Sequence, residues 1–326
     1  MERKKVLVTG VGGNVGQGII RNIAKTKFDI AIVGTNISDF SAGNHLCDVF
    51  YKVPYAYDEN FIPTICEIVE KEKIDLIIPS TDYEVYYLAA NEAILGAALA
   101  ASKADTAAIY LDKYLSWEHH QQHDIPFAMS VLPSAYDGSF NEFILKPRKG
   151  RGSRGLHINP TSWVGFNDEE YMVQPFHKGK EITTAFYVNK AGELHGFITL
   201  LRSLENGATA QCKVVFDYDA ALKPMLEKMI AHTNFRGAAN LQAIVTEDGT
   251  IVPFEVNCRI SGTNSIRANF GFEDVKYTLQ EYLYNQQPDQ PAIIAGVAVR
   301  ILMDVIYQGK EDYADCKDSS AGFYLY

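Results

Sequence analysis

The sequence predicts an α/β unit with a parallel sheet, followed by an α+β unit built on antiparallel sheets. Over the first hundred residues, segments of strand type alternate with segments of helix type, which is typical of a parallel sheet covered by helices. From about residue 126, short strand runs follow one another between glycine loops, which indicates antiparallel pairing. After five mostly charged residues, the chain has an apolar run followed by Gly10, Gly13 and Gly16, a pattern that predicts a Rossmann-like strand, turn and helix.

The first unit is expected to span residues 1–105. Its strands are predicted at residues 6–9, 30–34 and 74–79, and its helices at residues 19–25, 61–70 and 83–95. Thr81 to Glu84 follow the end of a strand, where open α/β sheets bind ligands. A capping-box-like start at Ser102 opens a further helix, which carries Asp112 and Lys113 near its middle or end. That helix marks the crossing into the second unit.

The second unit is expected to consist of two parts, residues 106–178 and residues 179–326. Its strands are predicted at residues 143–145, 155–158, 171–174, 182–188 and 194–200. These runs are short and are separated by glycine-containing loops. Such a succession of strands favours an α+β arrangement over a second parallel sheet.

Length, composition and charge limit the classes of protein to which the chain can belong. The chain has 326 residues, of which 47% are hydrophobic, so that it can form two or three packed domains. Forty acidic residues against thirty basic ones give a net charge of −10, which argues against nucleic acid or an anionic membrane as the main partner. No apolar run approaches the length of a membrane span, and the basic start is followed by an apolar run that Thr9 and Gly10 interrupt, so no signal peptide is expected.

The cysteines predict a reducing, cytoplasmic environment. They are odd in number, widely spaced and never arranged as Cys-x-x-Cys, which favours free thiols over a disulfide framework or a zinc site. The five are Cys47, Cys66, Cys212, Cys258 and Cys316.

The glycine motif at the start raises the alternative of a bound NAD. A dinucleotide-binding unit needs an acidic residue at the end of its second strand, to hold the ribose hydroxyls. Here that strand ends in Thr35 and Asn36, and Asp39 follows three residues later. The Tyr-x-x-x-Lys pattern of short-chain reductases occurs only at Tyr313, near the C-terminus. We therefore favour a tight structural turn without a nucleotide.

A β-hairpin is predicted around Asp248 and Gly249. Alternating apolar runs flank this dipeptide, and such a pattern indicates a two-residue turn. Counting back from the turn pairs Gln242 with Glu255 and Asn240 with Asn257. Pro253 interrupts the pattern, since proline fits only at a sheet edge or a bulge.

The two faces of this hairpin differ in chemistry. Because strand side chains alternate, Gln242, Glu255 and Asn257 share one face. Opposed side chains have Cβ atoms about 5 Å apart, so amide and carboxylate oxygens converge there and suit Mg²⁺. The alternative is a solvated polar face. The other face is predicted to be core and to carry Leu241, Ala243, Val245, Val252, Phe254 and Val256.

A second cluster combines a lysine with a cationic glycine loop. Lys146 ends an apolar strand, and residues 147–155 are rich in glycine, arginine and lysine. Backbone N–H groups of such a loop can surround phosphates while the lysine supplies a point charge. Two alternatives are a nucleic-acid-binding Arg-Gly segment and a plain surface loop.

Taken together, these motifs make the chain resemble proteins of the ATP-grasp superfamily. The chain is most similar to one synthetase unit of the carbamoyl-phosphate synthase large subunit and to stand-alone carboxylate–amine ligases. The resemblance covers nearly the whole length and implies a Rossmann-like pre-ATP-grasp domain followed by a two-subdomain ATP-grasp fold. It is carried by Asp112-Lys113, Lys146-Pro147, the glycine loop, Gln242 and Glu255-Val-Asn-Cys-Arg259.

The resemblance also implies roles for individual residues. Lys146 would reach the ATP α-phosphate, with Lys113 in the same site, and Glu181 would lie at the ribose. Gln242, Glu255 and Asn257 would bind Mg²⁺, or Mn²⁺ in its place. The loop over the phosphates would comprise Gly150, Arg151, Gly152, Ser153 and Arg154, and the hinge beside the adenine would comprise Gln174, Pro175, Phe176 and His177.

Three further cations are candidates for catalysis. Arg259 and Lys213 would neutralise the γ-phosphoryl group. Arg267 is a candidate to hold a substrate carboxylate, because guanidinium and carboxylate match bidentately, and its alternative is an ordinary surface arginine. The chain departs from its relatives at Gln174, where an acid is usual, and at Cys258, where a proline is usual. Neither change removes an expected metal ligand.

The implied activity is an ATP- and Mg²⁺-dependent ligation of a carboxylate to an amine through an acyl phosphate. Its partners would be small-molecule carboxylate and amine substrates, in a cytoplasmic protein that binds neither nucleic acid nor membrane, with a homodimer as the common default. One alternative is a split-gene half of carbamoyl-phosphate synthase. The other is a nucleotide-binding module without catalysis, against which the intact Gln242, Glu255, Asn257 and Arg259 argue. His119 and His123, one helical turn apart, are interpreted as a solvated helix face.

Overall fold

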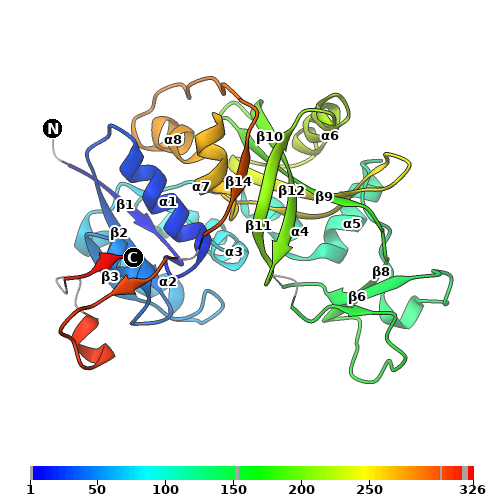
Figure 1. Ribbon diagram of the computed structural model, residues 1–326, viewed down its shortest axis with the longest axis horizontal. Coiled ribbons are helices and arrows are strands. Elements are labelled where there is room, and N and C mark those ends of the chain that lie inside the picture. The colour runs from blue at the N-terminus through cyan, green and yellow to red at the C-terminus, as the bar shows by residue number, and fades with distance from the viewer. Residues whose placement is uncertain (1–2, 151–153, 302, 318–321) are drawn as a thin grey trace.

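A computed structural model describes residues 3–150, 154–301, 303–317 and 322–326. Its first unit is a five-stranded parallel sheet in the order β3-β2-β1-β4-β5 (Figure 1). Helix α1 packs on one face through Ile19 and Ile23, and α2 packs on the other through Phe61 and Ile65. The predicted α/β class of this unit is confirmed. Its elements are β1 (Lys4–Val8), α1 (Asn14–Lys25), β2 (Ile30–Asn36), β3 (Val49–Lys52), α2 (Phe61–Glu72), β4 (Leu76–Ile78), α3 (Asp82–Ala90) and β5 (Ala98–Leu99).

The glycine turn has a packing role. Gly10 has a φ of +59°, which favours glycine, and a Cβ on Gly16 would lie 2.7 Å from the carbonyl oxygen of Gly10. A Cβ on Gly43 would lie 1.8 Å from the carbonyl oxygen of Val11. Asp39, the nearest candidate for a ribose, is paired with Lys317 at 2.7 Å. These contacts favour the interpretation as a tight structural turn.

Two helices connect the first unit to the second. A single helix through Asp112 was expected, but α4 (Ala104–Leu111) ends before it and α5 (Lys113–Gln122) begins after it. The Asp112 carboxylate accepts hydrogen bonds from the N–H groups of Tyr114 (3.0 Å) and Leu115 (3.3 Å), which is an N-cap. A true capping box occurs instead at Thr81 and Glu84, at the start of α3.

The second unit is dominated by a six-stranded antiparallel sheet in the order β13-β12-β9-β10-β11-β14 (Figure 1). One of its faces packs on α6, where Leu222 and Leu226 join the buried cluster of Phe186, and that cluster continues into the first unit. The other face contributes Ala185 and Tyr187 to the cluster around α1 and α8. The elements are β9 (Lys180–Val188), β10 (Leu194–Glu205), β11 (Ala208–Val215), α6 (Asp219–Ala231), β12 (Gly237–Val245), β13 (Ile251–Asn257), α7 (Asn264–Arg267), α8 (Asp274–Thr278) and β14 (Val297–Val299).

A separate three-stranded sheet lies at one end of the molecule, next to the large sheet (Figure 1). It comprises β6 (Phe143–Pro147), β7 (His157–Ile158) and β8 (Tyr171–Pro175) in the order β7-β6-β8, with antiparallel pairs. The predicted α+β class of the second unit is thereby confirmed. At the other end, β15 (Val305–Ile306) pairs with β16 (Tyr324–Leu325) beside the first sheet. Within the described ranges, no helix is both long and apolar enough to cross a membrane.

The β12–β13 hairpin reaches the predicted pairing by an unpredicted route. Thr246 N–H donates to the carbonyl of Thr250, so the loop has three residues rather than two. A register shift next to Gln242 then inserts one extra residue into β13. The two deviations cancel, and Gln242 pairs with Glu255 and Asn240 with Asn257 as predicted.

The bulge changes which side chains face the core. Val252 pairs with Ile244 rather than sharing the face of Leu241, and Pro253 is buried opposite Ala243. The ring of Phe254, which was predicted to be core, lies instead below the ammonium of Lys146. The predicted core face of the hairpin is therefore wrong at Val252 and Phe254, because the pattern placed no bulge at the proline.

Candidate functional site

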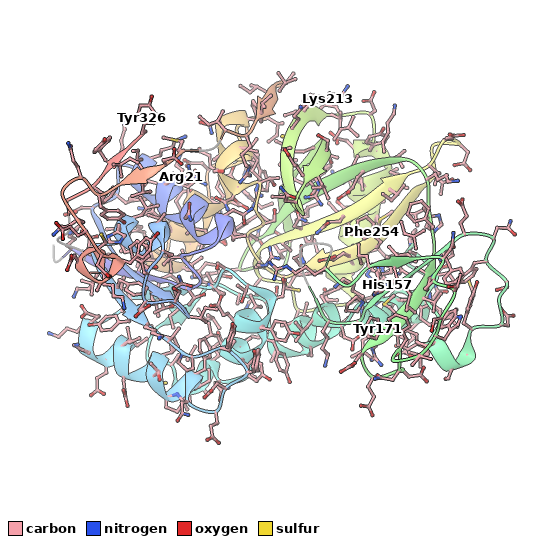
Figure 2. All side chains as sticks on the ribbon, turned by 60° about the horizontal axis from the view of Figure 1, so that its bottom comes forward. Arg21, His157, Tyr171, Lys213, Phe254 and Tyr326 are labelled. Atoms are coloured by element: carbon pink, nitrogen blue, oxygen red, sulfur yellow. The ribbon has the colours of Figure 1, made fainter. Side chains whose placement is uncertain are left out.

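Lys146 projects from the small sheet toward the large one. Its ammonium nitrogen lies 5.3 Å from the ring centre of Phe254 on β13, and its side chain is only 6% exposed. In Figure 2, Phe254 lies close to the small sheet that carries His157 and Tyr171. Burial and the nearby charge of Lys113 lower the pKa of Lys146 to about 7, against the opposing effect of Glu255. The site thus holds a buried amine whose charged form a bound anion would stabilise.

Lys113 connects the start of the glycine loop to the hairpin. Its ammonium donates to the carbonyl of Gly150 at 3.0 Å and lies 3.9 Å from the Glu255 carboxylate. The backbone N–H of Lys113 also donates to the carbonyl of Arg148 at 2.9 Å. The Arg148 guanidinium binds the Asp112 carboxylate at 2.9 Å, so the cap of α5 also fixes the strand that carries Lys146. Lys113 therefore contacts both the start of the loop that follows Lys146 and the carboxylate of Glu255.

The predicted magnesium group is assembled as a hydrogen-bonded row. Gln242 Nε2 donates to Asn257 Oδ1 at 3.1 Å, and Asn257 Nδ2 donates to Glu255 Oε1 at 3.0 Å. Burial raises the pKa of Glu255, but the charge of Lys113, the hydrogen bond from Asn257 and the charges of Lys146 and Arg259 outweigh it, so the net pKa lies below its ordinary value. An ionised carboxylate beside an amide oxygen is a donor set that suits a hard cation.

Arg202 is a site residue that the sequence analysis missed. Its guanidinium donates to Glu181 Oε1 and, at 2.6 Å, to Gln242 Oε1. It thereby connects the residue expected at the ribose with the predicted metal group. The signal was available only from strand alternation: Arg202 pairs with Cys212, whereas its neighbour Leu201 pairs with Lys213 and points to the opposite face.

Lys213 does not join the site. Because it shares the face of Leu201, its side chain leaves the sheet on the side opposite to Arg202. It is exposed, and in Figure 2 it lies at the top of the view, away from Phe254. The expectation that Lys213 neutralises a phosphoryl group is therefore corrected, and Arg202 is the cation that the hairpin of β10 and β11 supplies.

Arg259 joins the site to the first unit. Its guanidinium binds the Asp82 carboxylate at 2.8 and 3.1 Å. Asp82 is the first residue of α3, so this ion pair holds the start of α3 close to the end of β13. Asp82, Thr81 and Tyr83 line a pocket together with the proposed site residues. The whole lining is Thr81, Asp82, Tyr83, Tyr110, Leu111, Lys113, Gly150, Glu255 and Asn257. The segment after β4 thus lines the same pocket as Glu255 and Asn257 of the hairpin.

Arg267 has a structural role. Its side chain has no exposed surface, and its guanidinium is paired with the fully buried carboxylate of Asp274. It also donates to the hydroxyls of Ser261 and Thr263, both at 2.8 Å. A substrate carboxylate has no access to this group, and so the expected catalytic role of Arg267 is corrected. It is not a surface arginine either.

The expected hinge connects the small sheet to the large one. Gln174 is buried and donates to the hydroxyl of Ser130 at 2.9 Å, so its amide faces inward. Pro175 ends β8, and the backbone N–H of Phe176 donates to the carbonyl of Glu142 at 2.9 Å. Burial, and then the charge of Lys146, lower the pKa of His177, whose Nε2 is buried without a partner in the described chain.

The other expected residues are placed as follows. Arg154 is exposed, and Arg151, Gly152 and Ser153 lie outside the described residues. Cys258 is buried, and all five cysteines are free thiols. The rings of His119 and His123 lie 4.6 Å apart, but no cluster of three or more His, Cys, Asp or Glu side chains in the described ranges is arranged to hold a metal.

Comparisons with known proteins bear on the fold. Residues 6–98 match the family of PylC-like N-terminal domains. No curated protein matches the sequence. Among solved structures, N5-carboxyaminoimidazole synthetase from Staphylococcus aureus, complexed with ADP, has a TM-score of 0.72 at 14% identity, with 92% of this chain and 82% of that chain covered.

Two further structures give the same picture. A biotin carboxylase–ATP complex from Campylobacter jejuni has a TM-score of 0.70 at 13% identity, with 90% of this chain and 74% of that chain covered. N5-carboxyaminoimidazole ribonucleotide synthetase from Thermotoga maritima has a TM-score of 0.69 at 15% identity, with 93% and 84% covered. At such identities the likeness shows the fold, and it confirms the fold class that the sequence predicted.

Proposed function

We propose that this chain, which has the ATP-grasp fold, is an ATP- and Mg²⁺-dependent ligase that joins a carboxylate to an amine through an acyl phosphate. The observation that carries the proposal is the convergence of Lys146 from the small sheet with Glu255 and Asn257 from the large one, around Lys113. The solved structures of similar fold support it, since their names include ADP and ATP complexes of synthetases and carboxylases.

The roles proposed for the residues follow from their charge and position. Lys146 and Lys113 would bind the phosphates, because Lys113 donates to the carbonyl of Gly150 and the buried Lys146 lies near enough to interact with the charge of Lys113. Glu255 and Asn257 would hold Mg²⁺, which when bound draws charge from the phosphate oxygens. Arg259 would lie near the transferred phosphoryl group, and its pairing with Asp82 orients it. Phosphoryl transfer depends mainly on such positioning and charge neutralisation.

The substrates would be small molecules that reach the pocket beside Asp82 and Tyr83. The carboxylate would attack the γ-phosphorus of ATP, releasing ADP, and the amine would then displace phosphate from the acyl phosphate. An acyl phosphate needs shielding from water, and the small sheet with its glycine loop is suited to cover it. A cytoplasmic location and a homodimer complete the proposal.

A thermal-unfolding experiment tests nucleotide binding directly. A non-hydrolysable ATP analogue at a hundred times its dissociation constant adds about 2.7 kcal/mol of stability, which raises the unfolding midpoint measurably. We expect that rise with the analogue plus Mg²⁺ and a smaller one when Mg²⁺ is chelated. NADH and NADPH serve as controls for the glycine turn. A rise with NADH but none with the analogue would refute the proposal.

The depressed pKa of Lys146 predicts pH-dependent nucleotide binding. In the free protein the amine is protonated below about pH 7 and neutral above it. Because phosphates bind the charged form, affinity for the Mg²⁺–ATP analogue should fall as pH rises from 7 to 9, by at most about tenfold per pH unit. Isothermal titration calorimetry at several pH values measures this. In Lys146→Arg the guanidinium stays charged, so an equal decline in that variant would contradict the assignment.

A further inference from the structure

We propose that Arg202 holds the side-chain oxygen of Gln242 away from the metal, so that Glu255 and Asn257 hold the divalent ion that accompanies ATP without Gln242. This inference rests on the proposed function, since it concerns the ion that accompanies the nucleotide. It makes Arg202 a positioning residue, and it replaces the expected group of three ligands with a group of two.

The position of the Arg202 guanidinium is fixed independently of Gln242. Nε donates to Glu181 Oε1 at 3.0 Å, and Nη2 donates to the same oxygen. Nη1 lies 3.4 Å from the hydroxyl of Thr209, which is on β11. The side chain is only 12% exposed. A planar guanidinium anchored on two neighbouring strands cannot move aside without losing these bonds.

The amide of Gln242 is oriented by its two neighbours. Its oxygen accepts from Arg202 Nη2 at 2.6 Å, and its nitrogen donates to Asn257 Oδ1 at 3.1 Å. Turning the amide over would oppose its N–H groups to the guanidinium and its oxygen to Asn257 Oδ1. Both bonds would become repulsive contacts, since guanidinium only donates and the Asn257 oxygen only accepts. The Gln242 oxygen therefore stays toward the arginine.

A cation at this oxygen would meet a like charge. Mg²⁺ binds oxygen ligands at about 2.0–2.1 Å. Such an ion on Gln242 Oε1 would lie next to the Arg202 guanidinium, which donates to the same atom at 2.6 Å. The two positive charges would repel each other in a partly buried site. Glu255 also faces a cation, the ammonium of Lys113 at 3.9 Å, but its carboxylate carries the negative charge that attracts a metal ion and that Gln242 lacks.

Mn²⁺ provides the test, because it can replace Mg²⁺ and because electron paramagnetic resonance measures the concentration of unbound Mn²⁺. The chain is titrated with Mn²⁺ in the presence of a saturating non-hydrolysable ATP analogue, which gives the dissociation constant of Mn²⁺. Gln242→Ala should leave the Mn²⁺ dissociation constant within about twofold, whereas Glu255→Gln should raise it at least about tenfold. A rise of tenfold or more in Gln242→Ala would overturn the inference.

An isosteric variant guards against misfolding. In Gln242→Glu the new carboxylate should be taken up by Arg202, so Mn²⁺ affinity should again change by no more than about twofold. If Gln242 belonged to the metal shell, the added negative charge would tighten Mn²⁺ binding by about tenfold or more, and the inference would fail. Arg202→Met should weaken binding of the analogue itself, because Glu181 loses its partner, while Arg21→Met, an exposed arginine on α1, should not.

The outcomes separate the two proposals. If the wild-type chain binds neither the analogue nor Mn²⁺ with it, the proposed function fails and this inference fails with it. If Mn²⁺ binds with the analogue but depends on Gln242 as strongly as on Glu255, only the present inference fails. Binding that depends on Glu255 and not on Gln242 supports both.

Discussion

Glu255→Gln should reduce ADP release by roughly a thousandfold while the chain remains folded. Glu255 is the only carboxylate in the row formed with Asn257 and Gln242, and it also faces the ammonium of Lys113 at 3.9 Å. A bound metal stabilises transition-state charge by several kcal/mol, and each 1.36 kcal/mol corresponds to a factor of ten in rate. Removing the charge that holds the metal removes most of that gain. A coupled assay for ADP, run over a library of acid and amine pairs, measures it.

The same hairpin offers a matched control. Glu247 lies in the exposed loop at its far end, so Glu247→Gln removes one carboxylate with the same chemistry. ADP release in this control should stay within about twofold of wild type, because an exposed loop charge contributes little. Circular dichroism on both variants checks the fold. Equal activity in Glu255→Gln and wild type would remove Glu255 from the site.

Arg267→Met should destabilise the chain by about 3–5 kcal/mol. The variant leaves the carboxylate of Asp274 fully buried without its partner, and an uncompensated buried charge carries a cost of that order. The hydroxyls of Ser261 and Thr263 lose a donor as well. Urea unfolding followed by circular dichroism gives the midpoint, which should fall clearly below that of wild type.

A double variant distinguishes the buried charge from simple loss of packing. Arg267→Met combined with Asp274→Leu removes both charges, and well-packed apolar pairs often replace a buried ion pair with little loss. The double variant should therefore recover much of the stability lost in the single one. If it is less stable than Arg267→Met alone, packing and the hydroxyl bonds, rather than the charge, explain the effect.

The parts of the site that could be predicted lie in local patterns. Lys146 ends an apolar strand just before a glycine loop, and the hairpin dipeptide fixed the approximate pairing of Gln242 and Glu255. The strand and loop around Lys146 depend on neighbours in the sequence, which period and turn chemistry describe well. The Rossmann-like start could be predicted for the same reason, because strand, turn and helix follow one another within the first 25 residues. The pairing of Gln242 with Glu255 was reached only because the three-residue loop and the extra residue in β13 cancel.

The parts that could not be predicted depend on pairing between distant strands. Whether Arg202 or Lys213 faces the site is decided by the register of β10 and β11, which is itself shifted by a bulge after Ser203. A shift of one residue reverses every face, and the sequence marks no such shift. Arg267 was misjudged because an arginine with a buried acidic partner resembles a surface arginine in sequence. Only burial separates the two.

The β12–β13 hairpin also limits how this region can vary in length. Its three-residue loop and the extra residue in β13 shift the pairing in opposite directions, and only together do they place Gln242 opposite Glu255. Deleting one loop residue would slide one strand past the other and turn alternate side chains to the wrong face. In related sequences, a loss or gain at the turn should therefore be accompanied by a compensating change at the position of Phe254. The length of the loop and the presence of the extra residue at Phe254 should therefore vary together.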